Sequence, residues 1–153
     1  MKIRLADKDD VKALTKLRRK LYALHEQLDP LEYGLIKKPG FFLARELNAF
    51  IQSSDALVLV AEESGKIEGY LFGVIKNNPS FLRLKRKGRV GEIYLSESAR
   101  GKKVGERLLK KSFDWFKKHG INTVDCVVDF RNKQSLKFFS AKSLQVQQTR
   151  RLL

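Results

Sequence analysis

A short basic loop between an apolar stretch and a helical pattern has the residue types needed to bind a phosphate group. Residues 100–105 read Arg-Gly-Lys-Lys-Val-Gly and follow the apolar and aromatic residues of segment 90–95. The first turn of a helix carries unpaired backbone N–H groups and the positive end of the helix dipole, and glycine lets an anion approach the backbone closely. We therefore expect residues 88–105 to form a strand, an anion-binding loop and a helix start that would suit a pyrophosphate.

This stretch resembles the signature of the GCN5-related N-acetyltransferases (the GNAT superfamily), in which [Arg/Gln]-x-x-Gly-x-[Gly/Ala] follows the central strand and binds the pyrophosphate of acetyl-CoA. Arg100 and Gly105 match the first and last positions, and Lys103 stands where the signature has a glycine. Residues 132–139 are similar to the family's Asn-x-x-[Ser/Ala]-x-x-Phe-Tyr segment, with Phe139 in place of the usual tyrosine. The resemblance spans nearly the whole chain.

The resemblance implies that acetyl-CoA is the acetyl donor and lies along the central strand, the basic loop and the helix of the second stretch. Carried onto the matching positions, it predicts cofactor contacts at Ile93, Tyr94, Leu95, Arg100, Gly101, Lys102, Lys103, Val104, Gly105, Asn132, Ser135, Phe138 and Phe139. No metal is expected, because His25, His119 and Cys126 do not have the spacing of metal ligands.

The reaction that the resemblance implies is direct attack of an acceptor amine on the thioester in a ternary complex. The backbone of residues 92–96 would bind the pantetheine and polarise the acetyl carbonyl. Glu92 precedes Arg100 by eight positions, about where family members often place a general base, and by alternation it shares a strand face with Tyr94. Both are candidate catalytic residues, and an ion pair with a nearby lysine is the alternative role for Glu92. Phe139 has no proton to give to the leaving thiolate.

The acceptor amine must lose its proton before it attacks. At pH 7 this costs about 4.6 kcal/mol for a lysine and about 1 kcal/mol for an α-amine, so a weak base favours α-amines. In the resembled family the region after the first helix lines the acceptor pocket. His25, Glu26 and Asp29 are therefore candidate contacts for a cationic acceptor, and a capped helix end with a solvent-facing histidine is the alternative.

Hydrophobic periodicity predicts the elements that must position these residues. Apolar residues recur at helical spacing from Val11 to Leu28, behind an N-cap at Asp7, and the basic face of that helix is expected to be solvated. A loop is expected over residues 31–40, and Gly69 and Gly73 are expected to mark bulges or close packing. Further helices are expected before residues 53–55, after Gly105, and over the segment that follows Asn132. The expected strands are residues 2–5, 56–61, 67–75, 90–95, 122–128 and 144–153.

The order of these elements predicts an α/β (α+β) fold. A strand–helix–strand unit over residues 90–128 requires parallel pairing, whereas the preceding hairpin is antiparallel. We expect a GNAT-like mixed central sheet of about six to seven strands with helices on both faces, in the order β-α-α-β-β-β-α-β-α-β. Residues 1–153 are expected to form one acetyltransferase-like domain.

The composition of the chain limits the kinds of partner that we expect. The formal net charge of +15 and the pI of about 10.1 favour weak binding of polyanions. The basic run 83–89 could bind nucleic acid or the 3′-phosphate of coenzyme A, or form a solvated hairpin tip. Cys126 is the single cysteine and is expected to be a core thiol, and the apolar run 56–61 is too short to cross a bilayer. We expect a cytoplasmic monomer or homodimer without a membrane partner.

Two functions remain open at this point. The leading hypothesis is an acyltransferase enzyme, an N-acetyltransferase that moves the acetyl group of acetyl-CoA to a primary amine of a small molecule or of a protein, at its N-terminus or a lysine. The alternative is a catalytically weakened module of the same fold, in which Lys103 and Phe139 mark a degenerate site. Such a module would bind CoA, nucleic acid or the ribosome through its basic surface.

Overall fold

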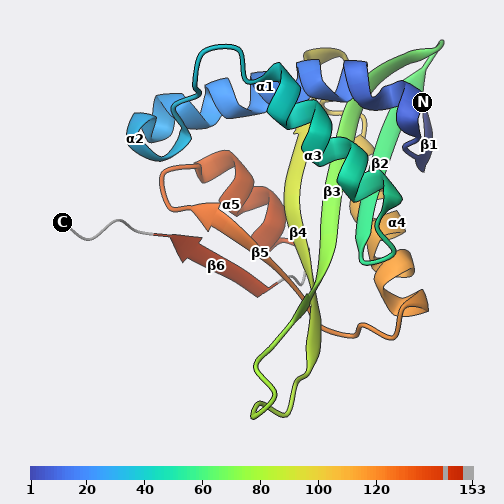
Figure 1. The fold of residues 1–153 in the computed structure, drawn as a ribbon, viewed down its shortest axis with the longest axis vertical. Coiled ribbons are helices and arrows are strands. Elements are labelled where there is room, and N and C mark those ends of the chain that lie inside the picture. Colours follow the sequence, from blue (N-terminus) through green and yellow to red (C-terminus); the bar gives the residue numbers. More distant parts are fainter. Residues whose placement is uncertain (143–144, 150–153) are drawn as a thin grey trace.

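A six-stranded sheet with its strands in sequence order forms the centre of the chain (Figure 1). The computed structural model describes residues 1–142 and 145–149. Pairing is antiparallel from the first to the fourth strand and parallel from the fourth to the sixth, which confirms the expected mixed sheet. Of the predicted strand 144–153, residue 144 and residues 150–153 lie outside the described residues. The strands are β1 (Lys2–Leu5), β2 (Ala56–Glu63), β3 (Lys66–Asn77), β4 (Arg86–Leu95), β5 (Val124–Asp129) and β6 (Gln145–Thr149).

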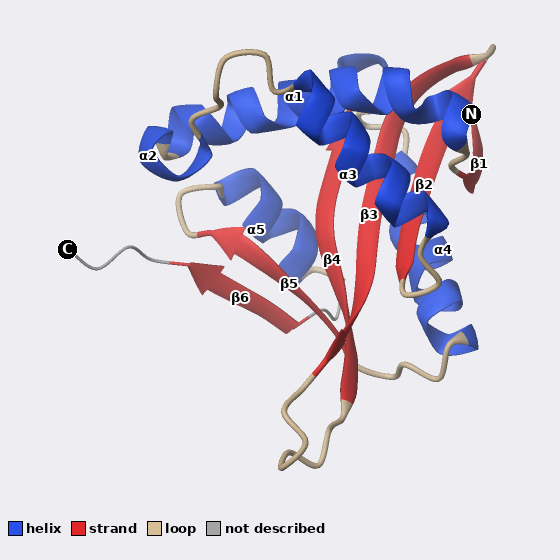
Figure 2. Ribbon diagram, in the orientation of Figure 1, coloured by secondary structure: helices blue, strands red, loops and turns tan. Residues whose placement is uncertain are grey.

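Helices cover both faces of the sheet (Figure 2). On one face, α1 and α3 bury Leu14 and Leu47 against Val60 and Tyr70. On the other, the apolar side of α4 packs on β2, β3 and β4 through residues such as Leu108. The helices are α1 (Val11–Leu28), α2 (Pro30–Tyr33), α3 (Gly40–Gln52), α4 (Val104–Lys118) and α5 (Lys133–Ser140), with 3₁₀ turns η1 (Lys8–Asp10) and η2 (Glu97–Ala99).

The short helix α2 corrects the expectation of a continuous loop over residues 31–40. Asp29 caps it by accepting a hydrogen bond from the backbone N–H of Glu32, and Pro30 occupies the first turn, where its missing N–H has no consequence. The proline that ends α1 therefore begins a new helix.

The bulges that the sequence predicted occur where two glycines lie on β3. Phe72 pairs with Glu92 and Gly73 with Val90, so Gly91 is the extra residue of a bulge in β4. A Cβ atom on Gly69 would lie 2.6 Å from a methyl carbon of Leu95, which confirms close packing there. A bulge bends its strand and increases its twist. The bend in β4 falls at the point from which it runs apart from β5.

The strands β4 and β5 pair over a short stretch and then diverge. Their register covers Gly88 with Val124, Arg89 with Asp125 and Val90 with Cys126, whereas β4 continues to Leu95. Beyond Val90 the β5-facing edge of β4 has no strand partner among the described residues. The sheet therefore opens as a wedge.

A buried carboxylate stabilises the closed end of this wedge. Asp125 is 1% exposed and accepts hydrogen bonds from Lys87 Nζ and Arg89 Nε, each at 2.7 Å. Burial works against the ionised form, but these two cations keep the pKa of Asp125 below its ordinary value. The interpretation of residues 83–89 as a solvated tip is thus wrong for Lys87 and Arg89 and correct for Arg83 and Lys85, which are exposed.

Within residues 1–142 and 145–149, no helix combines the length and the apolar character that crossing a bilayer requires.

Candidate active site

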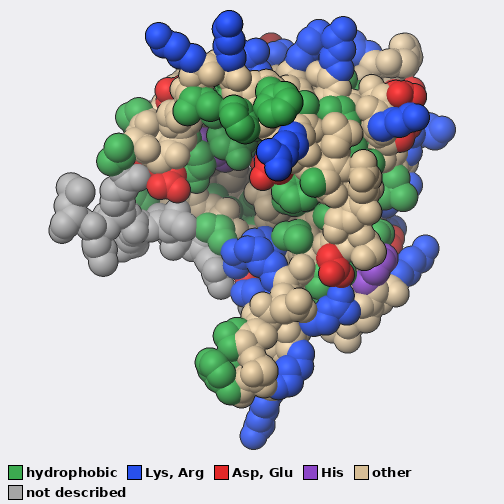
Figure 3. Space-filling view, in the orientation of Figure 1, with side chains coloured by type: hydrophobic (Ala, Val, Ile, Leu, Met, Phe, Trp, Pro, Cys, Tyr) green, Lys and Arg blue, Asp and Glu red, His purple; other side chains and the backbone are tan. Residues whose placement is uncertain are grey.

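A cavity of about 790 Å³ lies where β4 and β5 part, between α1 and α2 on one side and α5 on the other. Figure 3 shows the hollow that it makes in this face of the molecule. Residues 101–105, Glu26 and Asp29 are not part of its lining. The sequence-predicted site residues that line it are His25, Glu92, Ile93, Tyr94, Leu95, Arg100, Asn132, Ser135, Phe138 and Phe139.

One wall of the cavity is the free edge of β4. Residues 92–95 pair with β3 on one side, whereas on the cavity side the backbone N–H and C=O groups of residues 91–95 have no strand partner among the described residues. Unpaired backbone groups in a strand are a template for an extended ligand that carries amides of its own. The cavity can therefore hold a chain-like molecule as an added strand.

Glu92 lies at the bend of β4 with its carboxylate held by two side chains. Arg18 donates from Nε to Oε2 at 2.9 Å and from Nη2 to Oε1 at 2.5 Å. The hydroxyl of Tyr70 donates to Oε2 at 2.9 Å. A carboxylate has about four lone-pair sites, so three donated hydrogen bonds leave one, on Oε1, for a ligand or a water.

Arg18 is the site residue that the sequence interpretation missed. Its helix face was expected to be solvated, yet Arg18 is 3% exposed and also donates to Glu46 Oε2 at 2.7 Å. The signal was present in the spacing, because Arg18 follows the buried Leu14 by four residues and precedes the buried Leu21 by three. An arginine buried on the apolar stripe of a helix needs an acidic partner, and Glu92 is that partner.

Tyr94 and Tyr70 continue the polar wall beside Glu92. Their rings stack with centroids 6.4 Å apart, which confirms that Glu92 and Tyr94 share a strand face. Burial of the ring, together with the nearby Glu92 charge, raises the pKa of Tyr70 well above its ordinary value. Tyr70 therefore stays protonated and remains a hydrogen-bond donor.

His25 lies in the same cavity and contacts Tyr33 edge to face, with ring centroids 4.9 Å apart. Loss of hydration lowers the pKa of His25, although the negative charges of Glu92 and Asp129 oppose this. The imidazole is therefore neutral at pH 7. The expectation of a solvent-facing histidine at a capped helix end does not describe it.

Asp29 is engaged outside the cavity. Besides capping α2, it accepts a hydrogen bond from Nη2 of Arg131 at 2.9 Å, and the same atom donates to Asp129 Oδ2 at 2.7 Å. The hydrogen bonds that Arg131 donates to Asp129 hold the pKa of Asp129 below its ordinary value. Arg131 thus ties the α1–α2 junction to the end of β5, while Glu26 is exposed.

The basic loop has the backbone conformation that its glycine signature requires. Gly101 has a φ of 72° and Lys103, where the signature has glycine, has a φ of 57°. Gly105 is buried in the first turn of α4, and a Cβ atom there would lie 3.1 Å from the ring of Phe138. The loop begins at Arg100, which donates to the backbone carbonyl of Leu95 at 3.1 Å and lines the cavity. The α4 N-terminus therefore lies next to that lining, with its first N–H groups outside any intrahelical bond.

Helix α5 forms the opposite wall. The side chain of Asn132 caps it by accepting a hydrogen bond from the backbone N–H of Ser135 at 3.0 Å, which leaves the amide NH₂ group of Asn132 as a donor.

Phe139 and Cys126 are both buried. Burial raises the pKa of the Cys126 thiol to about 11, which confirms the expected core thiol.

Comparisons with known proteins agree with this architecture. The model of the acetyltransferase (GNAT) family matches residues 20–143. No curated protein sequence matches significantly. Many solved structures share the fold, and three of them illustrate the match.

The first is a tetramutant of the BH1408 protein from Bacillus halodurans, with 19% identity, a TM-score of 0.81, and coverage of 100% of this chain and 99% of that one. The second is apo aminoglycoside 6′-N-acetyltransferase AAC(6′)-IG from Acinetobacter haemolyticus, with 17% identity, a TM-score of 0.77, and coverage of 100% and 97%. The third is a predicted acetyltransferase with acetyl-CoA from Clostridium acetobutylicum, with 19% identity, a TM-score of 0.74, and coverage of 99% and 93%. The family match covers most of the chain, and the protein belongs to the GNAT acetyltransferase family.

Proposed function

We propose that this protein is an acetyl-CoA-dependent N-acetyltransferase that acetylates a primary amine of a small molecule or of a protein. The observation that carries the proposal is the divergence of β4 from β5 after Val90, because it opens a cavity with a free strand edge beside the basic loop. In this proposal residues 1–153 act as one domain.

The residues present fit acetyl-CoA. Its pantetheine arm carries amides that can pair with the free edge of residues 91–95. The N-terminus of α4, together with Arg100, Lys102 and Lys103, supplies N–H donors and positive charge for the pyrophosphate. The ring of Phe138 lines the cavity and packs next to Gly105, so the arm would pass between this apolar wall and β4. The structure of the acetyltransferase from Clostridium acetobutylicum, which shares this fold, is described as containing acetyl-CoA.

The proposed reaction is direct transfer in a ternary complex. The acceptor nitrogen attacks the acetyl carbonyl carbon, the C–S bond breaks, and the sulfur leaves as a thiolate that takes a proton from water. A backbone N–H of β4 would stabilise the negative charge on the carbonyl oxygen, which requires no particular side chain. Phe139 contributes apolar surface and no proton.

We propose that Glu92 takes up the proton that the attacking amine loses. One water would carry this proton from the amine to the remaining lone pair of Oε1. Arg18 and Tyr70 fix the orientation of the carboxylate, so that this lone pair has a defined direction. The neutral imidazole of His25 lines the acceptor end of the same cavity and would accept a hydrogen bond from the incoming amine. In this proposal Glu26 and Asp29 act at the rim of the entrance, outside the cavity lining.

The experiment is an acetyl-transfer assay that follows thiol release from acetyl-CoA against a panel of amines, including peptides with different N-terminal residues, polyamines and aminoglycosides. Acceptor-dependent thiol release that the desthio analogue of coenzyme A inhibits in competition with acetyl-CoA supports the proposal. Tight acetyl-CoA binding without transfer to any acceptor would favour the weakened module of the same fold.

A further inference from the structure

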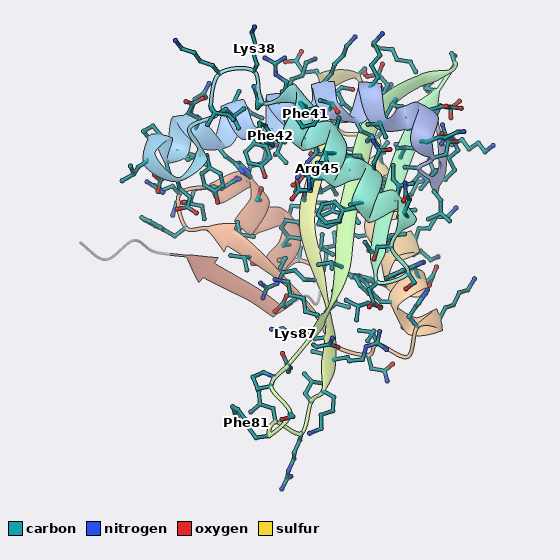
Figure 4. All side chains as sticks on the ribbon, viewed as in Figure 1. Lys38, Phe41, Phe42, Arg45, Phe81 and Lys87 are labelled. Carbon is teal, nitrogen blue, oxygen red and sulfur yellow. The ribbon has the colours of Figure 1, made fainter. Side chains whose placement is uncertain are left out.

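The loop between β3 and β4 presents apolar side chains to solvent at the end of a projecting hairpin. Phe81 is 84% exposed, Leu82 42% and Leu84 44%. Figure 4 shows Phe81 at the tip of the hairpin, which extends away from the rest of the fold, and Lys87 closer to the sheet. No side chain of the described residues covers this tip.

The tip is an ordered loop. The backbone N–H of Asn78 donates to the carbonyl of Lys85 at 2.8 Å, and the Asn78 side chain donates to the carbonyl of Leu84 at 2.9 Å. A turn from Pro79 to Leu82 is closed by a 3.0 Å backbone hydrogen bond, and Lys85 Nζ donates to the carbonyl of Ser80. The loop therefore holds its apolar side chains outward at a small cost in conformational entropy on binding.

Cations surround these apolar residues and acids are absent. Residues 78–87 contain Arg83, Lys85, Arg86 and Lys87 but no aspartate or glutamate. Arg86 pairs with Asp55 and Lys87 with Asp125, both on the side toward the sheet, so Arg83 and Lys85 carry the net charge of the tip. The tip is thus an apolar projection with positively charged side chains directly behind it.

This combination distinguishes between the possible partners. Single-stranded nucleic acid would use several aromatic platforms, but the tip offers Phe81 alone, and leucines have no complement in a phosphate backbone. A second copy of this chain would bring its own excess of positive charge toward Arg83 and Lys85. An anionic bilayer surface matches both parts, because aliphatic and aromatic side chains enter the acyl boundary while arginine and lysine remain at the headgroups.

We propose that the β3–β4 tip, residues 78–85, is a peripheral anchor that attaches this protein to anionic lipid bilayers. The expectation of no membrane partner rested on the lack of a spanning segment, which does not bear on attachment at the surface. The basic surface of the chain would add long-range attraction to the same bilayer, and the apolar tip would convert this attraction into retention. The inference does not depend on acetyl transfer.

The test is flotation of the full chain with vesicles of phosphatidylcholine that contain about 30% phosphatidylserine, an anionic lipid of the cytoplasmic leaflet. The Phe81→Ser, Leu82→Ser, Leu84→Ser triple variant is expected to lose binding by about 100-fold or more. The Arg83→Gln, Lys85→Gln double variant is expected to lose about 30-fold, and binding to pure phosphatidylcholine is expected to be weak.

The matched control is the Phe41→Ser, Phe42→Ser variant. These rings are 70% and 56% exposed on α3 and lie between Lys38 and Arg45, at a different place in the fold (Figure 4). This control is expected to bind vesicles like the wild-type chain. Each variant is first shown to unfold at the same temperature as the wild type.

Three results would overturn the proposal. The first is vesicle binding by the triple variant that equals the wild type, and the second is equal binding to neutral and anionic vesicles. The third is a tip-dependent association with single-stranded RNA, or between copies in size-exclusion chromatography, without any tip-dependent vesicle binding.

Discussion

The guanidinium of Arg18 on α1 holds both carboxylate oxygens of Glu92 on β4, through Nε at 2.9 Å and Nη2 at 2.5 Å. The pair joins α1, which lines the cavity, to the bend of β4. Since Arg18 is 3% exposed, the pair is screened little by solvent and fixes the position of the carboxylate.

The first prediction concerns proton transfer. Glu92→Gln keeps the shape of the side chain but removes the base, so we expect kcat to fall by about 100-fold while the Kd of acetyl-CoA is unchanged. The measurement is steady-state kinetics with the best acceptor, together with calorimetry. Glu46→Gln is the matched control, because Glu46 also binds Arg18 but lies outside the cavity lining, and we expect it to retain kcat within a few-fold. Unchanged kcat in Glu92→Gln would remove Glu92 from the mechanism.

The second prediction concerns pH and His25. Burial lowers the pKa of His25 in the folded state below its ordinary value of 6.5. As the pH falls, the imidazole is therefore protonated in the unfolded chain before it is protonated in the folded chain. The stability contributed by the neutral imidazole is present in full above pH 6.5 and is lost as the pH falls through the folded pKa. Between pH 8 and pH 5, we expect the free energy of unfolding to fall more for the wild type than for His25→Gln. Parallel pH dependence in urea titrations would contradict a buried neutral His25.

The third prediction concerns the backbone of the basic loop. Lys103 has a φ of 57°, a conformation that costs a non-glycine residue about 1 to 2 kcal/mol. Glycine relieves this strain but loses about 0.5 to 1 kcal/mol of backbone entropy, so Lys103→Gly should raise the free energy of unfolding by about 0.5 kcal/mol. Lys103→Ala, which keeps the strain, should give no gain. Equal unfolding curves for the two variants would show that strain at this position has no effect on stability.

The fourth prediction concerns the closed end of the wedge. Asp125→Ala leaves Lys87 and Arg89 without their shared acid, so we expect the free energy of unfolding to fall by about 3 kcal/mol at pH 7. Asp55→Ala breaks the exposed pair with Arg86 and should cost less than about 1 kcal/mol.

Acid provides the second arm of this test. Because the pKa of Asp125 is lowered in the folded state, its contribution is present above the ordinary value of 3.8 and is lost as the pH falls through the folded pKa. The difference between the wild type and Asp125→Ala should therefore shrink in that range. A difference that persists there would mean that the aspartate acts through packing and not through its charge.

Local patterns predicted most of the fold. The leucines of α1 at helical spacing, the hairpin strands on either side of Ser64 and Gly65, and the glycine that ends α4 all follow from short-range physics. The short helix α2 was missed because Pro30 stops one helix and starts another, and the local sequence does not distinguish the two roles.

The site was predicted less completely because its geometry depends on contacts between distant residues. The residues on β4 and α5 that were predicted to bind the cofactor came from a motif, and they line the same cavity. The pairs Asp125–Arg89 and Arg131–Asp29, in contrast, join residues that are 36 and 102 positions apart in the sequence, and no periodicity indicates such pairs. Arg18 was the exception, since its place among leucines on α1 predicts burial.

Calorimetric titration of the protein with acetyl-CoA near physiological salt, with ATP as a control for unspecific attraction of a polyanion to a chain of charge +15, tests the central claim most directly. The account predicts saturable one-to-one binding of acetyl-CoA that ATP does not reproduce. Binding of acetyl-CoA no tighter than binding of ATP would contradict it and would mean that the wedge between β4 and β5 does not hold the cofactor.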